Sequence, residues 1–302
     1  MRHFVGVDIG GTNYTVALAD ERGDIVEQFR RRTSVARGAQ GVVDGVTVAL
    51  AKLLRTAKRR RRVVERIGLG FGGPVDFARQ QILRSHHVEG WADYPLCETL
   101  AARFQVPCVM DNDGNVGALG EWRFGAGHGH RDLLYVNLGT GIGGGLILDG
   151  QLVRGARNLA GEIGHLTVNP NGPVCTCGRR GCLESLAAGP YLARRATEVR
   201  GAPTTSESLF IAAQAGEQWA RAIVAEAANA LAFAIGATLC LCNPSVVILG
   251  GGIAEAGDTL LRPVRRALQQ YALDFNRRGV KLVRAQLGYD AGVRGAVALA
   301  MA

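Results

Sequence analysis

The sequence predicts an α/β protein with two domains. The chain has 302 residues, which is room for two domains of ordinary size. A pattern of strand, glycine turn and strand occurs twice, over residues 4–18 and 134–148, so each copy stands near the beginning of one half. Strand patterns at residues 108–110 and 246–249 each lead into a helical pattern. A composition of 47% hydrophobic and 20% charged residues is typical of a soluble globular protein.

The two hairpin patterns have glycines at their tips. The first reads Asp8-Ile-Gly10-Gly11-Thr12 and the second Gly139-Thr140-Gly141. Backbone N–H groups at such tips can cradle phosphate oxygens, because the missing side chains allow close approach. Neither tip matches the dinucleotide fingerprint or the Walker A loop. An ordinary tight turn explains either hairpin alone, but the pair, with Asp8 and Thr12, predicts a polyphosphate held from both sides.

A basic run, Lys58–Arg62, follows a helical pattern over Val43–Leu54. The formal net charge of +9 suits anionic ligands such as nucleotides. We interpret the run as a solvated helix C-terminus, where cations favour the helix dipole. A nucleic-acid patch is the alternative, but no helix-turn-helix extension or interleaved aromatic residue accompanies the run.

An acidic turn follows the strand pattern Cys108–Met110. It reads Asp111-Asn112-Asp113-Gly114-Asn115 and precedes a helix of small residues. One polar residue is enough to cap a helix, and this turn holds four. A carboxylate at a helix start can be either a cap or a positioned base, and the residues alone leave both interpretations open.

A cysteine-rich loop is the most informative stretch of the chain. His165 and three cysteines lie within eighteen positions, and Glu162 and Glu184 stand at the two ends. Three thiols and one imidazole can form a tetrahedral Zn²⁺ site, whose ligands are Cys175, Cys177, Cys182 and His165. The alternative is a surface loop with three reduced cysteines and no metal.

A third glycine turn, Gly250-Gly251-Gly252, follows the buried-strand pattern Val246–Leu249 and opens a helical pattern. It is either a plain strand-to-helix turn or a place where a flat adenine lies on bare backbone; we assign Gly251 and Gly252 to the nucleotide. The preceding helix, Trp219–Thr238, is apolar almost all round and is expected to be buried. Cys240 and Cys242 at its end are interpreted as small core residues.

The compartment follows from cysteine use and hydropathy. No apolar run reaches the ~18 residues of a membrane span, and the chain enters a strand pattern at Phe4 with no signal peptide. Seven cysteines, three of them clustered, argue against a disulfide framework and for a reducing compartment. We therefore expect a cytoplasmic protein that binds no membrane and no nucleic acid.

Together these motifs resemble the ROK family (repressors, open reading frames and sugar kinases), most closely its glucokinase-like branch, over essentially the whole chain. The resemblance implies an actin-like, ribonuclease-H-like fold of two α/β domains around an ATP cleft. We expect residues 1–113 with 285–302 to form the N-terminal domain and residues 114–284 to form the C-terminal domain with the zinc loop. A C-terminal helix, Ala291–Ala300, is expected to return to the first domain.

The resemblance also implies roles for single residues. Asp113 matches the catalytic base, and the sugar ligands are Gly73, Asn112, Glu162, His165 and Glu184. The phosphate loops are matched by Gly10, Gly11, Thr12, Thr140 and Gly141, and Asp8 matches the acid near Mg²⁺. His165, Cys175, Cys177 and Cys182 match a structural zinc site.

The implied activity is an ATP-dependent hexokinase that phosphorylates the 6-hydroxyl of glucose, with ATP, Mg²⁺ and structural Zn²⁺ as cofactors. Its partners are the sugar and ATP, and a homodimer or homotetramer is expected. A kinase for N-acetylmannosamine, N-acetylglucosamine or another hexose is the alternative. A sugar-responsive repressor without its DNA-binding module is less favoured, because the first hairpin begins at once. The loop His86-His87-Val-Glu-Gly90-Trp91 lacks the family's usual Asn-Leu-Pro, which leaves the identity of the sugar open.

Overall fold

The computed structural model describes residues 2–11, 13–33, 37–85 and 88–302, which form two compact units. Unit 1 comprises Met1–His128, Leu152–Ala160 and Asp290–Ala302. Unit 2 comprises Gly129–Gln151 and Gly161–Tyr289. The expected contributions of Thr12, His86 and His87 lie outside the described residues.

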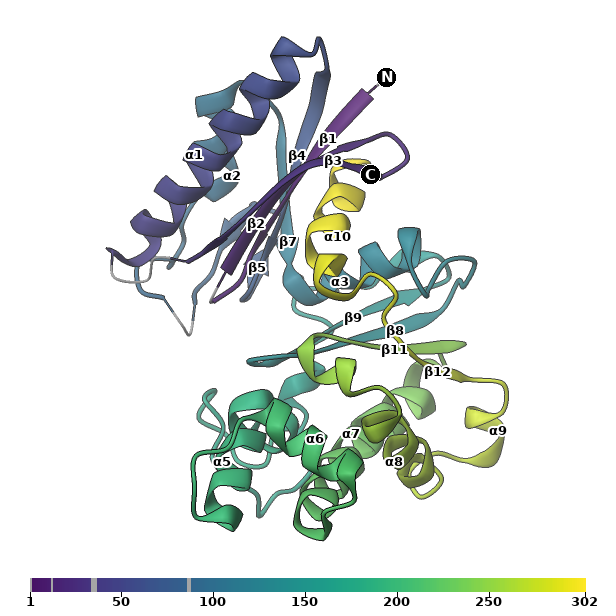
Figure 1. Cartoon of the computed structure of the whole chain (residues 1–302). Coiled ribbons are helices and arrows are strands. Elements are labelled where there is room, and N and C mark those ends of the chain that lie inside the picture. The colour runs from purple at the N-terminus through teal and green to yellow at the C-terminus, as the bar shows by residue number, and fades with distance from the viewer. Residues whose placement is uncertain (1, 12, 34–36, 86–87) are drawn as a thin grey trace. The chain divides into compact units, whose positions relative to one another are not determined.

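Unit 1 is built on a five-stranded mixed sheet with the order β3-β2-β1-β4-β7 (Figure 1). Its strands are β1 Arg2–Ile9, β2 Asn13–Asp20, β3 Ile25–Arg32, β4 Val63–Phe71 and β7 Cys108–Asn112. The first three strands pair antiparallel, whereas β1, β4 and β7 pair parallel. The carboxyl ends of β1, β4 and β7 therefore lie at one edge, where open α/β sheets bind ligands. A short ribbon of β5 Val75–Asp76 and β6 Gln81–Ile82 follows β4.

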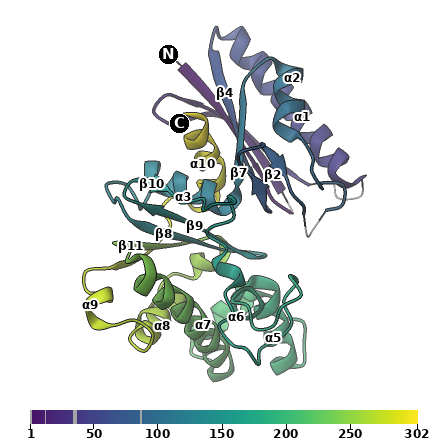
Figure 2. The same cartoon turned by 180° about the vertical axis from the view of Figure 1, so that it is seen from behind.

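Helices cover both faces of this sheet. The helices α1 Gly38–Arg59 and α2 Leu96–Phe104 lie on one face, and α3 Asp113–Phe124 and α10 Ala291–Ala300 lie on the other (Figures 1 and 2). The backbones of α3 and α10 approach closely because both helices carry glycines. A methyl group built on Gly120 or Gly295 would collide with a backbone carbonyl of the other helix. The C-terminal helix has the expected bounds.

The basic run forms the C-terminus of α1. Lys58 and Arg59 lie in its last turn, and Arg61 adopts a left-handed conformation with φ of 53° where the helix ends. Residues 58–61 are exposed and Arg62 is half-buried. The interpretation as a solvated helix C-terminus is therefore confirmed.

Unit 2 is built on a second five-stranded sheet with the order β10-β9-β8-β11-β12. Its strands are β8 Leu133–Leu138, β9 Ile142–Leu148, β10 Gln151–Leu152, β11 Val246–Gly250 and β12 Lys281–Arg284. Its helices are α4 Glu184–Ala187, α5 Gly189–Arg200, α6 Ser206–Ala215, α7 Gln218–Cys242, α8 Asp258–Leu268 and α9 Asp274–Arg277. The longer helices pack together into the main apolar core of the unit (Figure 2).

Helix α7 is the central helix of that core. It has 25 residues and a mean hydropathy of 1.7 over its most apolar window, so by length and composition alone it could cross a membrane. However, 61% of that window is buried inside the protein, as in the core helix of a globular unit. The expected burial is thus confirmed. The assignment of Cys240 to the core is wrong, because the last turn of α7 leaves the core and exposes this thiol.

Candidate active site

Two glycine turns and the acidic helix start converge in unit 1. The phosphate-side turn begins at Gly10, directly after β1, and the sugar-side turn begins at Gly72, directly after β4. The Gly72 N–H donates to the carbonyl of Ile9 over 2.9 Å. A methyl group built on Gly72 would lie 3.6 Å from Gly10 Cα and 3.6 Å from Asp113 Oδ2. The proposed base, sugar turn and phosphate turn therefore form one cluster.

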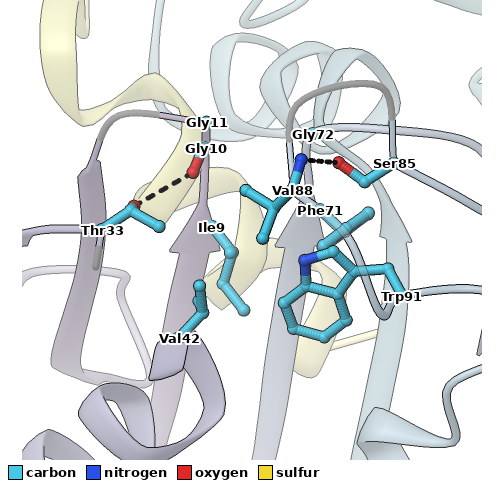
Figure 3. Close-up of a pocket in the computed structure, with 10 residues that line it drawn as sticks. All are labelled: Ile9, Gly10, Gly11, Thr33, Val42, Phe71, Gly72, Ser85, Val88 and Trp91. Atoms are coloured by element: carbon cyan, nitrogen blue, oxygen red, sulfur yellow. Dashed lines mark hydrogen bonds between the residues drawn. The ribbon is translucent and has the colours of Figure 1, made fainter. Parts of the chain in front are cut away.

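A small cavity adjoins this cluster. It has a volume of about 10 Å³ and is lined by Ile9, Gly10, Gly11, Thr33, Val42, Phe71, Gly72, Ser85, Val88 and Trp91 (Figure 3). The Thr33 hydroxyl donates to the Gly10 carbonyl over 3.2 Å and fixes the phosphate-side turn. A cavity of this size holds at most one water molecule, so it is too small for a sugar.

Asn112 provides the cap of helix α3. Its Oδ1 accepts a hydrogen bond from the Gly114 N–H over 2.8 Å, and its Nδ2 donates to the Gly73 carbonyl over 3.0 Å. Asp113 Oδ1 shares the Gly114 N–H at 2.9 Å, and Oδ2 faces Gly72. Asn112 therefore caps the helix, and the carboxylate of Asp113 lies beside it at the first helical position.

Gly73 is a position where only glycine fits. A methyl group built there would lie 2.9 Å from the carbonyl of Arg84 and 3.0 Å from the ring of Phe71. The hydrogen bond from Asn112 fixes this turn against the end of β7. A ligand at this turn would therefore meet bare backbone next to an amide side chain.

Asp8 occupies the carboxyl end of β1 and is half-buried. Burial raises the pKa of its carboxyl group to about 6, and the nearby Arg30 opposes this rise. Its carboxylate packs directly against Gly292 in the first turn of α10, where a methyl group would collide with it. The positive end of the helix dipole favours an anion there. The position suits a carboxylate that approaches a cation bound to phosphate.

In unit 2, the four predicted zinc ligands lie together. The ligand atoms of His165, Cys175, Cys177 and Cys182 all lie within 4.8 Å of one another. Cys177 Sγ is 3.6 Å from Cys182 Sγ, and Cys175 Sγ is 3.8 Å from His165 Nδ1. A tetrahedron with Zn–S bonds of about 2.3 Å has edges of about 3.8 Å. The residues therefore fit a tetrahedral Zn²⁺.

The loop folds to bring the thiols inward. The Cys175 N–H donates to the Arg179 carbonyl over 2.7 Å, and Gly178 turns the chain with φ of 88°. Desolvation acts to raise the pKa of the Cys177 thiol, but hydrogen bonds from the Arg179 backbone and from the other two thiols outweigh it and lower that pKa to about 7. Desolvation and Cys177 raise the pKa of the Cys182 thiol to about 12. Metal binding would release the remaining protons.

Glu184 links the zinc loop to the second glycine hairpin. Its Oε2 accepts from the Ile142 N–H over 2.9 Å, and its Oε1 accepts from the Thr176 hydroxyl over 3.2 Å. A methyl group on Gly141 would lie 2.6 Å from Oε2. Desolvation raises the pKa of Glu162; His165 lowers it and Glu184 raises it further. Thus unit 2 groups Glu162, His165 and Glu184 beside the hairpin tip.

The remaining glycines lie at strand ends of the second sheet. The Gly139 N–H donates to the Gly141 carbonyl over 2.9 Å and closes the tip that carries the exposed Thr140. Gly251 has φ of 81°, and a methyl group there would collide with the Leu138 carbonyl, so the end of β11 packs against the end of β8. Gly252 begins a 3₁₀ turn.

One side chain beside the acidic turn, Arg154, has no motif in the sequence that points to it. Arg154 reaches Asp111, directly ahead of Asn112 and Asp113, from a loop 43 positions later in the chain. The only signal was Asp111 itself, because a carboxylate at the end of a buried strand needs a partner.

The fold, the glycine hairpins, the carboxylate at a helix start and the Cys/His cluster define a sugar kinase with the actin-like two-domain fold. The chain belongs to the ROK family, whose model matches residues 4–302. It is 36% identical to the glucokinase of Halalkalibacterium halodurans, over 97% of this chain and 93% of the relative. It is 31% identical to the N-acetylmannosamine kinase of Salmonella typhimurium, over 98% of this chain and 97% of the relative.

A solved structure has the same fold. The ROK family glucokinase from Streptomyces griseus, in complex with glucose and AMPPNP, matches 99% of each chain with a TM-score of 0.86 and 34% identity.

Proposed function

We propose that the chain is an ATP-dependent hexokinase that transfers the γ-phosphoryl group to the 6-hydroxyl of D-glucose. The observation that carries this proposal is the meeting of Asp113, Gly72 and Gly10 in unit 1, which puts a carboxylate next to a sugar turn and a phosphate turn. The similarity to a glucokinase over nearly the whole chain supports glucose as the acceptor.

Asp113 is the general base of this reaction. Phosphoryl transfer passes through a loose, highly charged transition state, so positioning and charge neutralisation dominate catalysis. Asp113 Oδ2 would accept the proton of the attacking hydroxyl, while its Oδ1 stays bound to the Gly114 N–H.

The nucleotide would be held by backbone at the glycine turns. Gly10, Gly11 and Thr12 would bind phosphate from unit 1; Thr140, Gly141, Gly251 and Gly252 would bind ATP from unit 2. When bound, Mg²⁺ neutralises phosphate charge, and Asp8 would approach it through water. Thr33 donates to the Gly10 carbonyl and so restrains the direction of this carbonyl at the turn.

The sugar ligands come from both units. Asn112 and the Gly73 backbone would contact the ring from unit 1, and Glu162, His165 and Glu184 would contact its hydroxyls from unit 2. These side chains would select among sugars by hydrogen-bonding to their hydroxyls. An epimer that leaves one buried polar group of the site without a hydrogen bond loses about 1–3 kcal/mol of binding free energy.

Zinc is structural in this proposal. His165 Nδ1 faces the thiols, so the other ring nitrogen is left to bind a sugar hydroxyl. When bound, the metal would fix the imidazole ring and the loop that carries Thr176 against Glu184. No proton or phosphoryl transfer involves the zinc.

An N-acetylmannosamine kinase is the second candidate, because a relative with that name is 31% identical over 98% of this chain. A coupled ADP-release screen decides between the two. We expect glucose to give the highest kcat/KM among hexoses and N-acetylhexosamines, with ATP preferred over polyphosphate. If an N-acetylhexosamine has a kcat/KM about tenfold above that of glucose, a difference of about 1.4 kcal/mol in transition-state binding, the assignment of glucose is wrong. The assignment as a sugar kinase would still stand.

The working form in this proposal is a cytoplasmic homodimer or homotetramer. An apolar patch on unit 2 supports it: Phe233 and Leu241 stand eight positions apart on α7, and Leu273 and Phe275 follow beside them. Leu241 and Phe275 are 85% and 74% exposed, which is unusual for large apolar side chains. Light scattering after gel filtration should give at least twice the 32.0 kDa chain mass, and Leu241→Glu should lower it.

A further inference from the structure

Asp111 is a buried carboxylate directly ahead of the proposed base. The residue is 1% exposed. Its Oδ1 accepts hydrogen bonds from the Asn112 backbone N–H over 2.8 Å and from Asn115 Nδ2 over 2.9 Å. These two bonds hold the end of β7 and the first turn of α3 in one geometry. Asp111 therefore contacts Asn112, directly before Asp113, and Asn115, two residues after it.

Arg154 provides the positive partner of Asp111. Its Nε donates to Asp111 Oδ2 over 2.7 Å, and its guanidinium lies 3.7 Å from the ring centroid of Phe77. The Arg154 side chain is 25% exposed, so the ion pair is largely shielded from water. Phe77 follows the Gly72–Gly73 turn by a few residues. Arg154 is thus held between the base-bearing strand and the segment after the sugar turn.

The backbone of Arg154 closes a loop. Its carbonyl accepts from the Ala160 N–H over 3.0 Å, and inside the loop the Asn158 N–H donates to the Gly155 carbonyl over 3.3 Å. Gly155 and Asn158 have φ of 71° and 59°, which makes the loop compact. The chain leaves the loop at Gly161 and reaches Glu162 in the next step.

We propose that Arg154 is a positioning residue of the kinase reaction. Through Asp111, its side chain fixes the orientation of Asn112 and Asp113, whereas its backbone carbonyl, which any residue at this position would keep, closes the loop at Ala160. This inference rests on the proposed function. A catalytic base displaced by about 1 Å can lose about 100-fold in rate, so a residue that only orients the base has a large effect.

The kinetic test compares three variants with the wild type at a temperature well below unfolding. Arg154→Met keeps the side-chain stem but leaves the Asp111 charge unpaired, and we expect its kcat/KM for glucose to fall by about tenfold or more. KM for ATP should stay within about twofold, since the side-chain contacts of Arg154 among the described residues are to Asp111 and Phe77 and not to Gly10 or Gly11. Arg154→Lys keeps the charge and should recover part of the loss. Arg262→Met, which breaks an exposed ion pair with Asp258, is the matched control and should behave as wild type.

A double variant separates orientation from folding. Asp111→Asn with Arg154→Gln replaces the buried ion pair by two neutral amides that can hydrogen-bond, and it should fold even where Arg154→Met does not. Its kcat/KM should exceed that of Arg154→Met. If Arg154→Met lowers only the unfolding temperature and keeps wild-type kcat/KM, the positioning role is refuted.

Hydrogen exchange tests the contact without any sugar or ATP. We expect Arg154→Met to speed exchange at the Asn112 amide, which donates to Asp111, and Arg262→Met to leave it unchanged. Wild-type protein that phosphorylates no hexose would refute the proposed function, while faster exchange would still support the structural link. Unchanged exchange together with unchanged kcat/KM would overturn the inference.

Discussion

At the scale of single residues, Asp113 is the carboxylate on which the chemistry depends. Asp113→Asn keeps the hydrogen bond to the Gly114 N–H but cannot accept a proton. We expect kcat to fall by at least about 100-fold, while glucose and ATP still bind. Single-turnover assays and calorimetric titrations measure these two effects. A variant that retains near-normal kcat would exclude Asp113 as the base.

Asp8 makes the stability of the protein depend on pH. Its folded pKa of about 6 lies above the ordinary value of 3.8, so the folded state holds this proton more tightly than the unfolded chain. The resulting stabilisation is fully present below pH 3.8 and is lost as the pH rises through 6. Asp8→Asn should therefore gain up to about 3 kcal/mol relative to wild type at pH 8, and less at pH 5.

Urea unfolding at the two pH values measures this difference. The same variant should lose kinase activity, because an amide cannot act as an anion beside the phosphate turn. A stability gain that does not depend on pH would show that burial of Asp8 is not its source.

The acidic turn around Asp113 was predictable from the sequence only in part. The polar turn after a short strand predicted a helix start and a cap or base, and the structure supplies the cap in Asn112. Arg154 could not be predicted, because its partner Asp111 lies 43 positions away and no periodic pattern links them. A buried charge predicts that an oppositely charged partner exists, but the partner can be identified only from the three-dimensional structure.

At the scale of elements, the zinc loop is the part most open to a direct test. Cys177→Ser removes the thiol with the lowest pKa and should reduce bound Zn²⁺ well below one per chain. Glucose affinity should fall as well, because His165 and Glu184 contact this loop. Elemental analysis and glucose titration measure both. A metal-free preparation with full activity would show that the kinase does not need zinc, although the four ligand residues lie together.

The close approach of α3 and α10 gives a second element-scale prediction. Gly295→Ala would drive a methyl group into the carbonyl of Val116, which helix backbone cannot avoid without moving. We expect a loss of about 1–3 kcal/mol in unfolding free energy, typical of overpacking. Thermal denaturation measures it. An unchanged melting temperature would mean that the two helices separate easily.

Elements with strong local patterns were predictable. Glycine between two apolar runs predicted both hairpins, and β1–β2 and β8–β9 pair as expected. The C-terminal helix expected from the family resemblance, Ala291–Ala300, is α10 with the same bounds. The order of the strands in each sheet could not be read locally, because β1 pairs with β4 and β8 with β11 across long stretches of chain.

At the scale of the whole molecule, unit 1 is assembled from three separate segments of the chain. Its last segment contributes α10, whose Val297 and Ala300 share an apolar cluster with Phe4 and Ala19. A chain that ends at Tyr289 retains all segments of unit 2 but leaves this cluster uncovered. We expect such a truncation to be inactive and poorly soluble, measured by sedimentation of the expressed protein and by glucose phosphorylation. Activity near that of the full chain would contradict the role of α10.

This arrangement has a consequence during synthesis on the ribosome. Translation proceeds at about 5–20 residues per second, and domains generally fold as they emerge. Unit 2 is complete once Tyr289 has been made, whereas the unit that carries Asp113 waits for the final segment, Asp290–Ala302. The nascent chain therefore exposes apolar surface on β1 and α3 until Asp290–Ala302 has been made, and chaperones can bind it during that time. A stop before Asp290 leaves the unit that carries Asp113 without α10, so that unit cannot pack completely.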